Sequence, residues 1–288
     1  ALTLSSSNTK TLQGPRTFHN SDTATWSDGT LQINSSAVFR NEAGATFTDQ
    51  TTNGNLLTSG IGTFRNFGTY TKSGTGTTTV CTVFDNLSTG TIKVQSGTLS
   101  LSGGGTSTGV SAISSGATLS ITGSEYILQT GSSLTGAGSV SVSSGDLTLH
   151  DGTYDVGATI ITGHYATFNV PASTGTLSLS GGTLAGNGNL TVSGQTTWTS
   201  GSMGCCGTVT ANGGLTLSGS ATKALLGPRN LINNGAATWS DGVFQIDSGA
   251  QFRNQAGATF NDQTTNGSLY DDPLISGVGT VRNAGTYT

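Results

Sequence analysis

Residues 1–54 recur at residues 214–267, at a constant offset of 213. The two segments are identical at 36 of 54 positions, and FRNEAGATFTDQTTNG in the first returns as FRNQAGATFNDQTTNG in the second. After a short insertion, SGIGTFRNFGTYT (59–71) returns as SGVGTVRNAGTYT (276–288). A long internal repeat is typical of an array whose units stack and bury one continuous core. The repeat therefore favours a structural or adhesive protein over an enzyme, because a catalytic site is not usually copied along an array.

Short apolar and polar residues alternate along most of the chain, as in GTLSLSGG (97–104) and NLTVSG (189–194). This period of two predicts β-strands, and the Gly-rich stretches between them predict turns. Only 8% of the residues are charged, whereas disordered chains are usually rich in charge and lack such alternation. The sequence therefore predicts an all-β fold.

The charge balance argues against several partners. The formal net charge is −4 and basic residues are few and scattered, whereas nucleic-acid binding needs a concentrated basic face. No apolar run is long enough to predict a membrane span in this segment. The chain starts without Met and stops inside a repeat, so we expect it to be a window onto a longer protein.

A shorter period runs inside the 213-residue repeat. The pattern F-x-N occurs four times, with spacings of 21, 25 and 20 residues, at Phe18/Asn20, Phe39/Asn41, Phe64/Asn66 and Phe84/Asn86. A period of about 20 residues with several short strands predicts one coil of a parallel β-solenoid, whose coils stack about 4.8 Å apart. Equivalent residues then lie above one another. We expect the Phe side chains to form an inward stack and the Asn side chains to form a hydrogen-bonded ladder.

The main alternative is an array of antiparallel sandwich domains. That fold predicts hairpin signals and linkers, and the sequence has neither. We therefore predict a continuous solenoid in which residues 1–213 are the first long repeat unit and residues 214–288 are the truncated start of a second.

Several long motifs are similar to a known class of protein. VQSGTLSLSGGGTS (94–107), LSLSGGTLAGNGNLTVSGQTTWTSGSM (177–203) and ANGGLTLSGSATK (211–223) resemble bacterial β-strand-repeat surface proteins. These are large, secreted, adhesin-like proteins. The resemblance implies a right-handed parallel β-helix, an extracellular or cell-surface location, and a role in adhesion or in a biofilm matrix. The chain departs from this pattern at Cys205-Cys206, where a Gly/Ser turn is expected.

Acidic residues provide the main candidates for chemistry. Asp146, Asp151 and Asp155 form the densest acidic cluster outside the repeat and are a candidate Ca²⁺ site, although their spacing lacks the EF-hand pattern. Asp28 and Asp49 recur at the repeat offset, which favours hydrogen bonds to backbone N–H groups in turns. The sequence predicts no catalytic residue, no cofactor and no other metal site.

The cysteines and tryptophans leave alternatives open. Cys81 lies 124 residues before Cys205, about 30 Å away in a solenoid, so the two are not expected to pair. Three interpretations of Cys205 and Cys206 stay open. They are small residues tolerated in a corner, or they form a vicinal disulfide, or they form a disulfide with a neighbouring molecule. Trp26 and Trp239 are repeat equivalents; a core position is favoured over a carbohydrate-stacking surface.

Two main functions follow from these patterns. The favoured hypothesis is a non-enzymatic extracellular filament or adhesin stalk. Its expected partners are further copies of itself, end to end or side by side, or the continuation of the same giant chain, together with cell-surface or matrix polysaccharide. The alternative is a carbohydrate-active β-helix enzyme or a carbohydrate-binding surface protein. An ice-binding protein is disfavoured because the Thr residues are placed irregularly.

Overall fold

The computed structural model describes residues 1–271 and 277–288, and the elements in these ranges are β-strands. Their side chains alternate between interior and surface, as the sequence predicts. In β5 (Thr30–Ile33), Leu31 and Ile33 are buried while the residues between them are partly exposed. In β6 (Val38–Asn41), Phe39 and Asn41 point inward in the same way. Burial of these apolar faces drives the chain to coil around its own interior.

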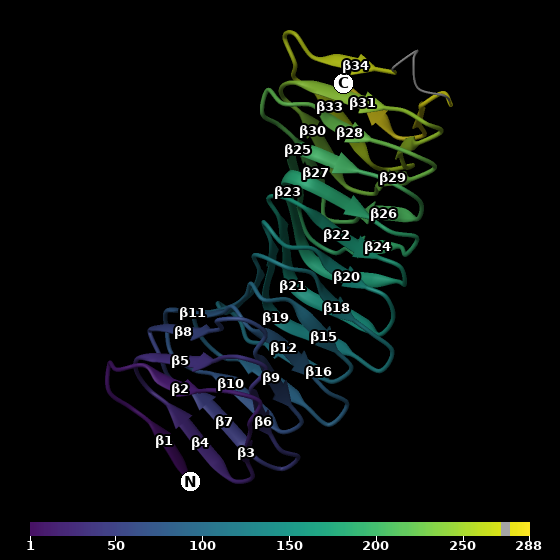
Figure 1. Cartoon of the computed structure of the whole chain (residues 1–288). Helices are drawn as coiled ribbons and strands as arrows, with labels where there is room; N and C mark the ends of the chain where they lie inside the picture. Colours follow the sequence, from purple (N-terminus) through teal and green to yellow (C-terminus); the bar gives the residue numbers. More distant parts are fainter. Residues whose placement is uncertain (272–276) are drawn as a thin grey trace. The chain divides into compact units, whose positions relative to one another are not determined.

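Each coil contains about three strands, and most strands pair in parallel with a strand of the coil before and a strand of the coil after (Figure 1). The chain is a parallel β-solenoid of about 13 turns with coils of about 21 residues. The predicted fold class is thereby confirmed. Because the stacked strands pair in parallel, the antiparallel sandwich alternative is wrong.

The chain divides into two compact units, Ala1–Val156 and Gly157–Thr288. The boundary falls within β21 (Thr153–Ile161). The repeat boundary at 213/214 lies inside the second unit.

In the first unit, the strands stack in three columns, each a set of parallel strands in register. The first column contains β1 (Leu2–Leu4), β4 (Thr23–Trp26), β7 (Thr46–Asp49), β10 (Thr69–Lys72), β13 (Thr91–Val94), β16 (Val110–Ile113) and the start of β19 (Ser133–Val142). The second contains β2 (Lys10–Leu12), β5, β8 (Asn53–Leu57), β11 (Thr77–Val80), β14 (Thr98–Leu101), β17 (Thr118–Ile121) and the end of β19. The third contains β3 (Thr17–Asn20), β6, β9 (Thr63–Asn66), β12 (Val83–Asn86), β15 (Gly105–Ser107), β18 (Tyr126–Leu128) and β20 (Leu147–Leu149).

In the second unit, two long strands, β23 (Ala172–Ala185) and β25 (Thr196–Met203), contribute to more than one column. One column continues from β23 through β24 (Leu190–Val192), β26 (Thr208–Ala211), β29 (Asn230–Asn233), β32 (Gln251–Asn254) and β35 (Thr280–Asn283). Another continues from β25 through β27 (Leu215–Leu217), β30 (Ala236–Trp239), β33 (Thr259–Asp262) and β36 (Thr286–Tyr287). The last contains β22 (Tyr165–Phe168), the ends of β23 and β25, β28 (Lys223–Leu225), β31 (Val243–Ile246) and β34 (Ser268–Tyr270).

The motif TWSDG, at residues 25–29 and again at 238–242, forms a turn that requires glycine. Gly29 has φ of +77°, and a Cβ atom there would lie 2.5 Å from the carbonyl oxygen of Asn8. Its repeat equivalent Gly242 has φ of +76°, and a Cβ would lie 2.5 Å from the carbonyl oxygen of Gly219. A side chain is excluded at both places by backbone conformation and by the neighbouring coil.

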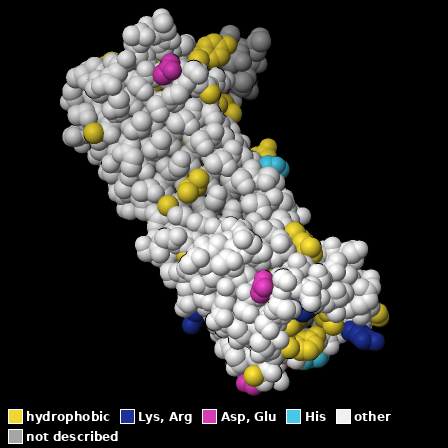
Figure 2. All heavy atoms as spheres, turned by 90° about the vertical axis from the view of Figure 1, so that its left-hand side faces the viewer, with side chains coloured by type: hydrophobic (Ala, Val, Ile, Leu, Met, Phe, Trp, Pro, Cys, Tyr) yellow, Lys and Arg dark blue, Asp and Glu magenta, His cyan; other side chains and the backbone are white. Residues whose placement is uncertain are grey.

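The surface carries few charges. Figure 2 shows one face on which the charged side chains are few and scattered. Among the described residues, no helix is long and apolar enough to cross a membrane.

Candidate functional sites

The F-x-N phenylalanines form a continuous stack in the third column of the first unit. The ring centroids of Phe18 and Phe39 lie 5.1 Å apart, and those of Phe39, Phe64 and Phe84 follow at 5.0 Å each. The planes of Phe64 and Phe84 differ by 2°. Phe47 meets the rings of Phe39 and Phe64 edge-on. Stacked and edge-to-face contacts between aromatic rings stabilise a fold by more than the burial of their surface alone. The stack therefore stabilises the packing of these successive coils.

The asparagines of the same motif form a buried amide ladder. The Nδ2 atoms of Asn20, Asn41 and Asn66 each donate to the Oδ1 atom of the next asparagine at 2.8 Å. The ladder ends where Asn86 donates to the Oγ atom of Ser107 at 3.3 Å. Each Asn also donates to a backbone carbonyl of the next coil. In the second unit a similar ladder joins Asn233, Asn254 and Asn283 on β29, β32 and β35.

A buried carboxylate also connects two successive coils. Asp49 is fully buried; its Oδ1 accepts from the backbone N and the Oγ1 of Thr51, and its Oδ2 accepts from the hydroxyl of Tyr70 at 2.9 Å. Burial, followed by the charge of Asp49, raises the pKa of Tyr70 well above its usual value. The repeat contains the same arrangement at Asp262 and Tyr287. Because both oxygens of Asp49 are hydrogen-bonded and no solvent reaches it, the carboxylate serves to join coils.

The other recurring acids act in turns, as predicted. Asp28 Oδ1 accepts from the backbone N of Gly29 at 2.7 Å, and Asp241 makes the same bond to Gly242. The interpretation of these acids as turn residues is confirmed.

The tryptophans lie in the interior. Trp26 is fully buried and Trp239 is 4% exposed. Each indole Nε1 donates to the backbone carbonyl two residues later, at 3.0 Å. A buried ring cannot stack on a carbohydrate, so neither residue forms a sugar-binding surface.

The acidic cluster does not come together as a metal site. Among the described residues, no three His, Cys, Asp or Glu side chains gather closely enough to hold a metal ion, and this includes Asp146, Asp151 and Asp155. Asp151 instead accepts from the Oγ1 of Thr130 and the backbone N of Gly152. Asp155 is exposed on β21. The candidate Ca²⁺ site is therefore not assembled.

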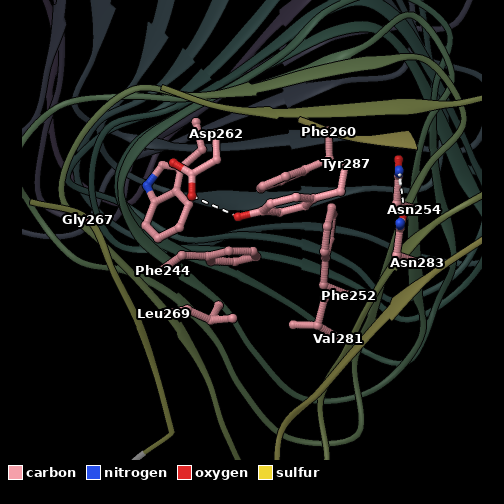
Figure 3. A pocket seen from close by; sticks show the side chains of 11 residues that line it. Phe244, Phe252, Asn254, Phe260, Asp262, Gly267, Leu269, Val281, Asn283 and Tyr287 are labelled. Carbon is pink, nitrogen blue, oxygen red and sulfur yellow. Dashed lines mark hydrogen bonds between the residues drawn. The ribbon is translucent and has the colours of Figure 1, made fainter. Parts of the chain in front are cut away.

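A hollow lies in the second unit, beside β34, β35 and β36. In the described part of the chain, each of these strands pairs with only one other strand. The hollow measures about 200 Å³ and Figure 3 shows it from close by. Its lining is mostly apolar and comprises Trp239, Phe244, Phe252, Asn254, Phe260, Asp262, Gly267, Leu269, Val281, Asn283 and Tyr287.

The side chains that line the hollow make the same kinds of contact as those in the interior of the first unit. The rings of Phe260 and Tyr287 stack with centroids 5.6 Å apart, and the Tyr287 hydroxyl donates to Asp262 at 2.8 Å (Figure 3). Tyr287 is 57% exposed, whereas its repeat equivalent Tyr70 is buried beneath the following coil, where Ile92 pairs with it. In the first unit, the equivalent surface around Tyr70 is covered by the next coil.

The cysteine pair lies in the turn between β25 and β26. Cys205 and Cys206 are free thiols with their sulfur atoms 3.3 Å apart, and Cys81 is also free. The hydrogen bond with Cys206, assisted by Arg229, lowers the pKa of Cys205, while the same bond raises the pKa of Cys206.

Among the described residues, three buried cations were missed by sequence reasoning. The Nζ of Lys72 donates to the carbonyl oxygen of Thr51 at 2.6 Å, and Arg229 is 1% exposed. The Nζ of Lys223 donates to the carbonyl oxygens of Ser218, Gly219 and Ala221, at 2.6–2.9 Å. For Lys223 and Arg229 the available signal was repetition, since both are identical at the 213-residue offset in a chain with few charges.

Comparison with known proteins found no matching family model, no matching curated protein and no matching solved structure. The functional argument therefore depends on the fold and on the placement of the residues described above.

Proposed function

We propose that this protein is a non-enzymatic structural segment of an extracellular filament or adhesin stalk. The observation that carries the proposal is the stacking of parallel strands in register from coil to coil. In the coils that carry F-x-N, phenylalanine rings and asparagine amides stack in the same register. Such one-dimensional stacking gives a stiff element that can be lengthened by adding coils.

The placement of the acids supports a mechanical role. The carboxylates copied by the repeat are bound in turns or buried between coils. A glycoside-cleaving enzyme needs two carboxyl groups facing one substrate. The similarity of the long motifs to bacterial β-strand-repeat surface proteins supports an extracellular or cell-surface location.

Parallel strands that stack in register allow extension by further coils, from the same chain or from another copy of it. Matrix polysaccharide is a second partner, reached through the Thr- and Ser-rich outer faces of the coils.

The first test is electron microscopy and fibre diffraction of the purified chain at increasing concentration. We expect thin filaments, a meridional spacing of about 4.8 Å from coil stacking, and a longer axial repeat of about 50 Å when 213-residue units follow one another. Particles that remain single at every concentration would contradict the self-associating filament.

Two matched variants distinguish the mode of association. Val281 in the hollow and Val110 on a flank of β16 are both 44% exposed. Val281→Glu should shorten filaments that grow end to end, whereas Val110→Glu should leave their length unchanged. The reverse result would indicate side-by-side association.

A separate assay addresses the enzymatic alternative. The chain is incubated with polyuronates and neutral polysaccharides, and new reducing ends and unsaturated products are measured. We expect no release above that of a heat-unfolded control. Turnover that depends on the folded chain would refute the non-enzymatic proposal.

A further inference from the structure

The turn that contains the two cysteines has an unusual backbone. Cys205 has φ of +62°, in the left-handed region that non-glycine residues seldom occupy. The strand register places glycine at the corresponding point of both adjoining coils, Gly186 with φ of +98° and Gly227 with φ of +70°. A cysteine therefore stands where the neighbouring coils use glycine. Strained positions of this kind are concentrated at functional sites.

The two sulfur atoms differ in access. Cys205 is exposed and Cys206 is partly buried, with 3.3 Å between their Sγ atoms. The Sγ of Cys205 also lies 3.6 Å from the Oδ1 of Asn187. An incoming reagent thus meets Cys205 first, and Cys206 stands within reach of the sulfur that has reacted.

A buried cation lies beneath this turn. Arg229 donates from Nε to the carbonyl oxygen of Gly204 and from Nη2 to that of Gly186, both at 2.7 Å. In the described part of the chain no carboxylate forms a salt bridge with it. Buried charges are usually paired, and here the ionisable groups that Arg229 acts on are the two thiols.

The charge of Arg229 favours a thiolate at Cys205. Burial lowers the pKa of Arg229 to about 10, so it stays protonated at neutral pH. The hydrogen bond with Cys206, followed by smaller contributions that include the Arg229 charge, lowers the pKa of Cys205, and the same bond raises the pKa of Cys206. The thiolate is the nucleophile in disulfide exchange.

We propose that Cys205 and Cys206 form a thiol–disulfide exchange site that accepts oxidising equivalents from a low-molecular-weight disulfide. The site is a property of the turn and does not depend on the filament role.

The exchange proceeds in two balanced steps. The Cys205 thiolate attacks one sulfur of the external disulfide, a mixed disulfide forms, and one thiolate leaves. This leaving thiolate takes the proton of Cys206. The Cys206 thiolate then attacks the Cys205 sulfur and displaces the second thiolate, which takes a proton from water. Two electrons pass to the external disulfide, which leaves as two thiols, and the cysteine pair becomes a vicinal disulfide.

The product is reversible because its ring is strained. Adjacent Cα atoms are about 3.8 Å apart, closer than the 4.4–6.8 Å range that ordinary disulfides prefer. Strained, exposed disulfides are more easily reduced and are the labile ones. The site therefore responds to the surrounding redox conditions and does not act as a permanent cross-link.

The test uses the full chain, fully reduced and then treated with oxidised glutathione. Intact-mass and peptide mass spectrometry should show the loss of two hydrogen atoms in the peptide that contains Cys205 and Cys206. Cys81, which is half-buried and accepts a hydrogen bond from Ser102, is an internal comparison and should remain a thiol.

Matched variants separate the two roles. Cys206→Ser should accumulate the glutathione adduct on Cys205, and Cys205→Ser should react about tenfold more slowly at Cys206. Arg229→Gln should slow the reaction of Cys205 several-fold, with circular dichroism as the check on folding. A persistent glutathione adduct in the unaltered chain, equal reaction at Cys81, or disulfide-linked dimers as the main product would each overturn the proposal.

Discussion

Replacement of Asn66 by alanine tests the role of the buried amide ladder. Asn66 accepts a hydrogen bond from Asn41 at 2.8 Å and donates to Asn86 at 2.8 Å and to the carbonyl of Thr91 at 3.1 Å. The side chain is fully buried, so water cannot replace these bonds. Loss of three buried hydrogen bonds, each worth about 1–1.5 kcal/mol, predicts a destabilisation of about 3–5 kcal/mol.

The assay is amide hydrogen exchange measured by mass spectrometry on β6, β9 and β12. Solenoid coils can open locally, so exchange reports the affected coils even when unfolding is not two-state. Because each 1.4 kcal/mol is a tenfold change in an equilibrium, exchange in these strands should accelerate by about two to four orders of magnitude.

Two controls bracket the effect. Arg65, the preceding residue on the same strand, points outward and its ion pair with Asp85 spans 4.0 Å; Arg65→Ala should change the opening free energy by less than about 0.5 kcal/mol. Asn20→Ala, at the end of the ladder, should have an intermediate effect. Equal exchange in the Asn66→Ala and Arg65→Ala variants would refute the reasoning that the ladder holds the coils together.

Four further substitutions probe other contacts. Tyr70→Phe should destabilise the first unit by about 1–3 kcal/mol in urea unfolding, because it leaves a buried carboxylate oxygen unpaired, while the exposed equivalent Tyr287→Phe should cost less; equal losses would contradict this. Lys223→Met should lower stability by several kcal/mol, about 2–5, since three carbonyl oxygens lose a charged donor; an unchanged midpoint would show that the ammonium group is dispensable. Hydrogen bonds from His19, then Arg40, lower the pKa of Glu42 from its usual 4.5. Above its usual pKa of 4.5 the ionised Glu42 therefore adds to the free energy of unfolding, and this contribution is lost as the pH falls through the lower pKa of the folded state. In a pH series of urea midpoints, the Glu42→Gln variant should lose less stability on the acid side than the unaltered chain.

The repeating pattern of the sequence was sufficient to predict the fold. Alternating residues specify strands, and the F-x-N motif marks the coil length, because equal positions in successive coils lie above one another. The motif spacings of 21, 25 and 20 residues are the offsets at which the phenylalanines pair across β3, β6, β9 and β12. Turns absorb the differences in coil length without disturbing the register.

The sequence was much less informative about which charged groups are buried. The contact of Asp49 with Tyr70 depends on register across coils, because the residues lie 21 positions apart. Asp146, Asp151 and Asp155 are close in sequence, yet they do not gather into a group that could hold a metal ion. Proximity along the chain is a poor guide in a solenoid, where neighbours in space are a full coil apart.

Arg229 shows what only the tertiary structure decides. Its guanidinium group is buried and donates to the carbonyl oxygens of Gly204 and Gly186, which lie in two earlier coils. The local motif GPR determines the turn, but the burial of this charge depends on the earlier coils that cover it. Strand, coil and repeat follow from the sequence because they depend on local periodicity, whereas burial and charge environment depend on which coils stack against a residue.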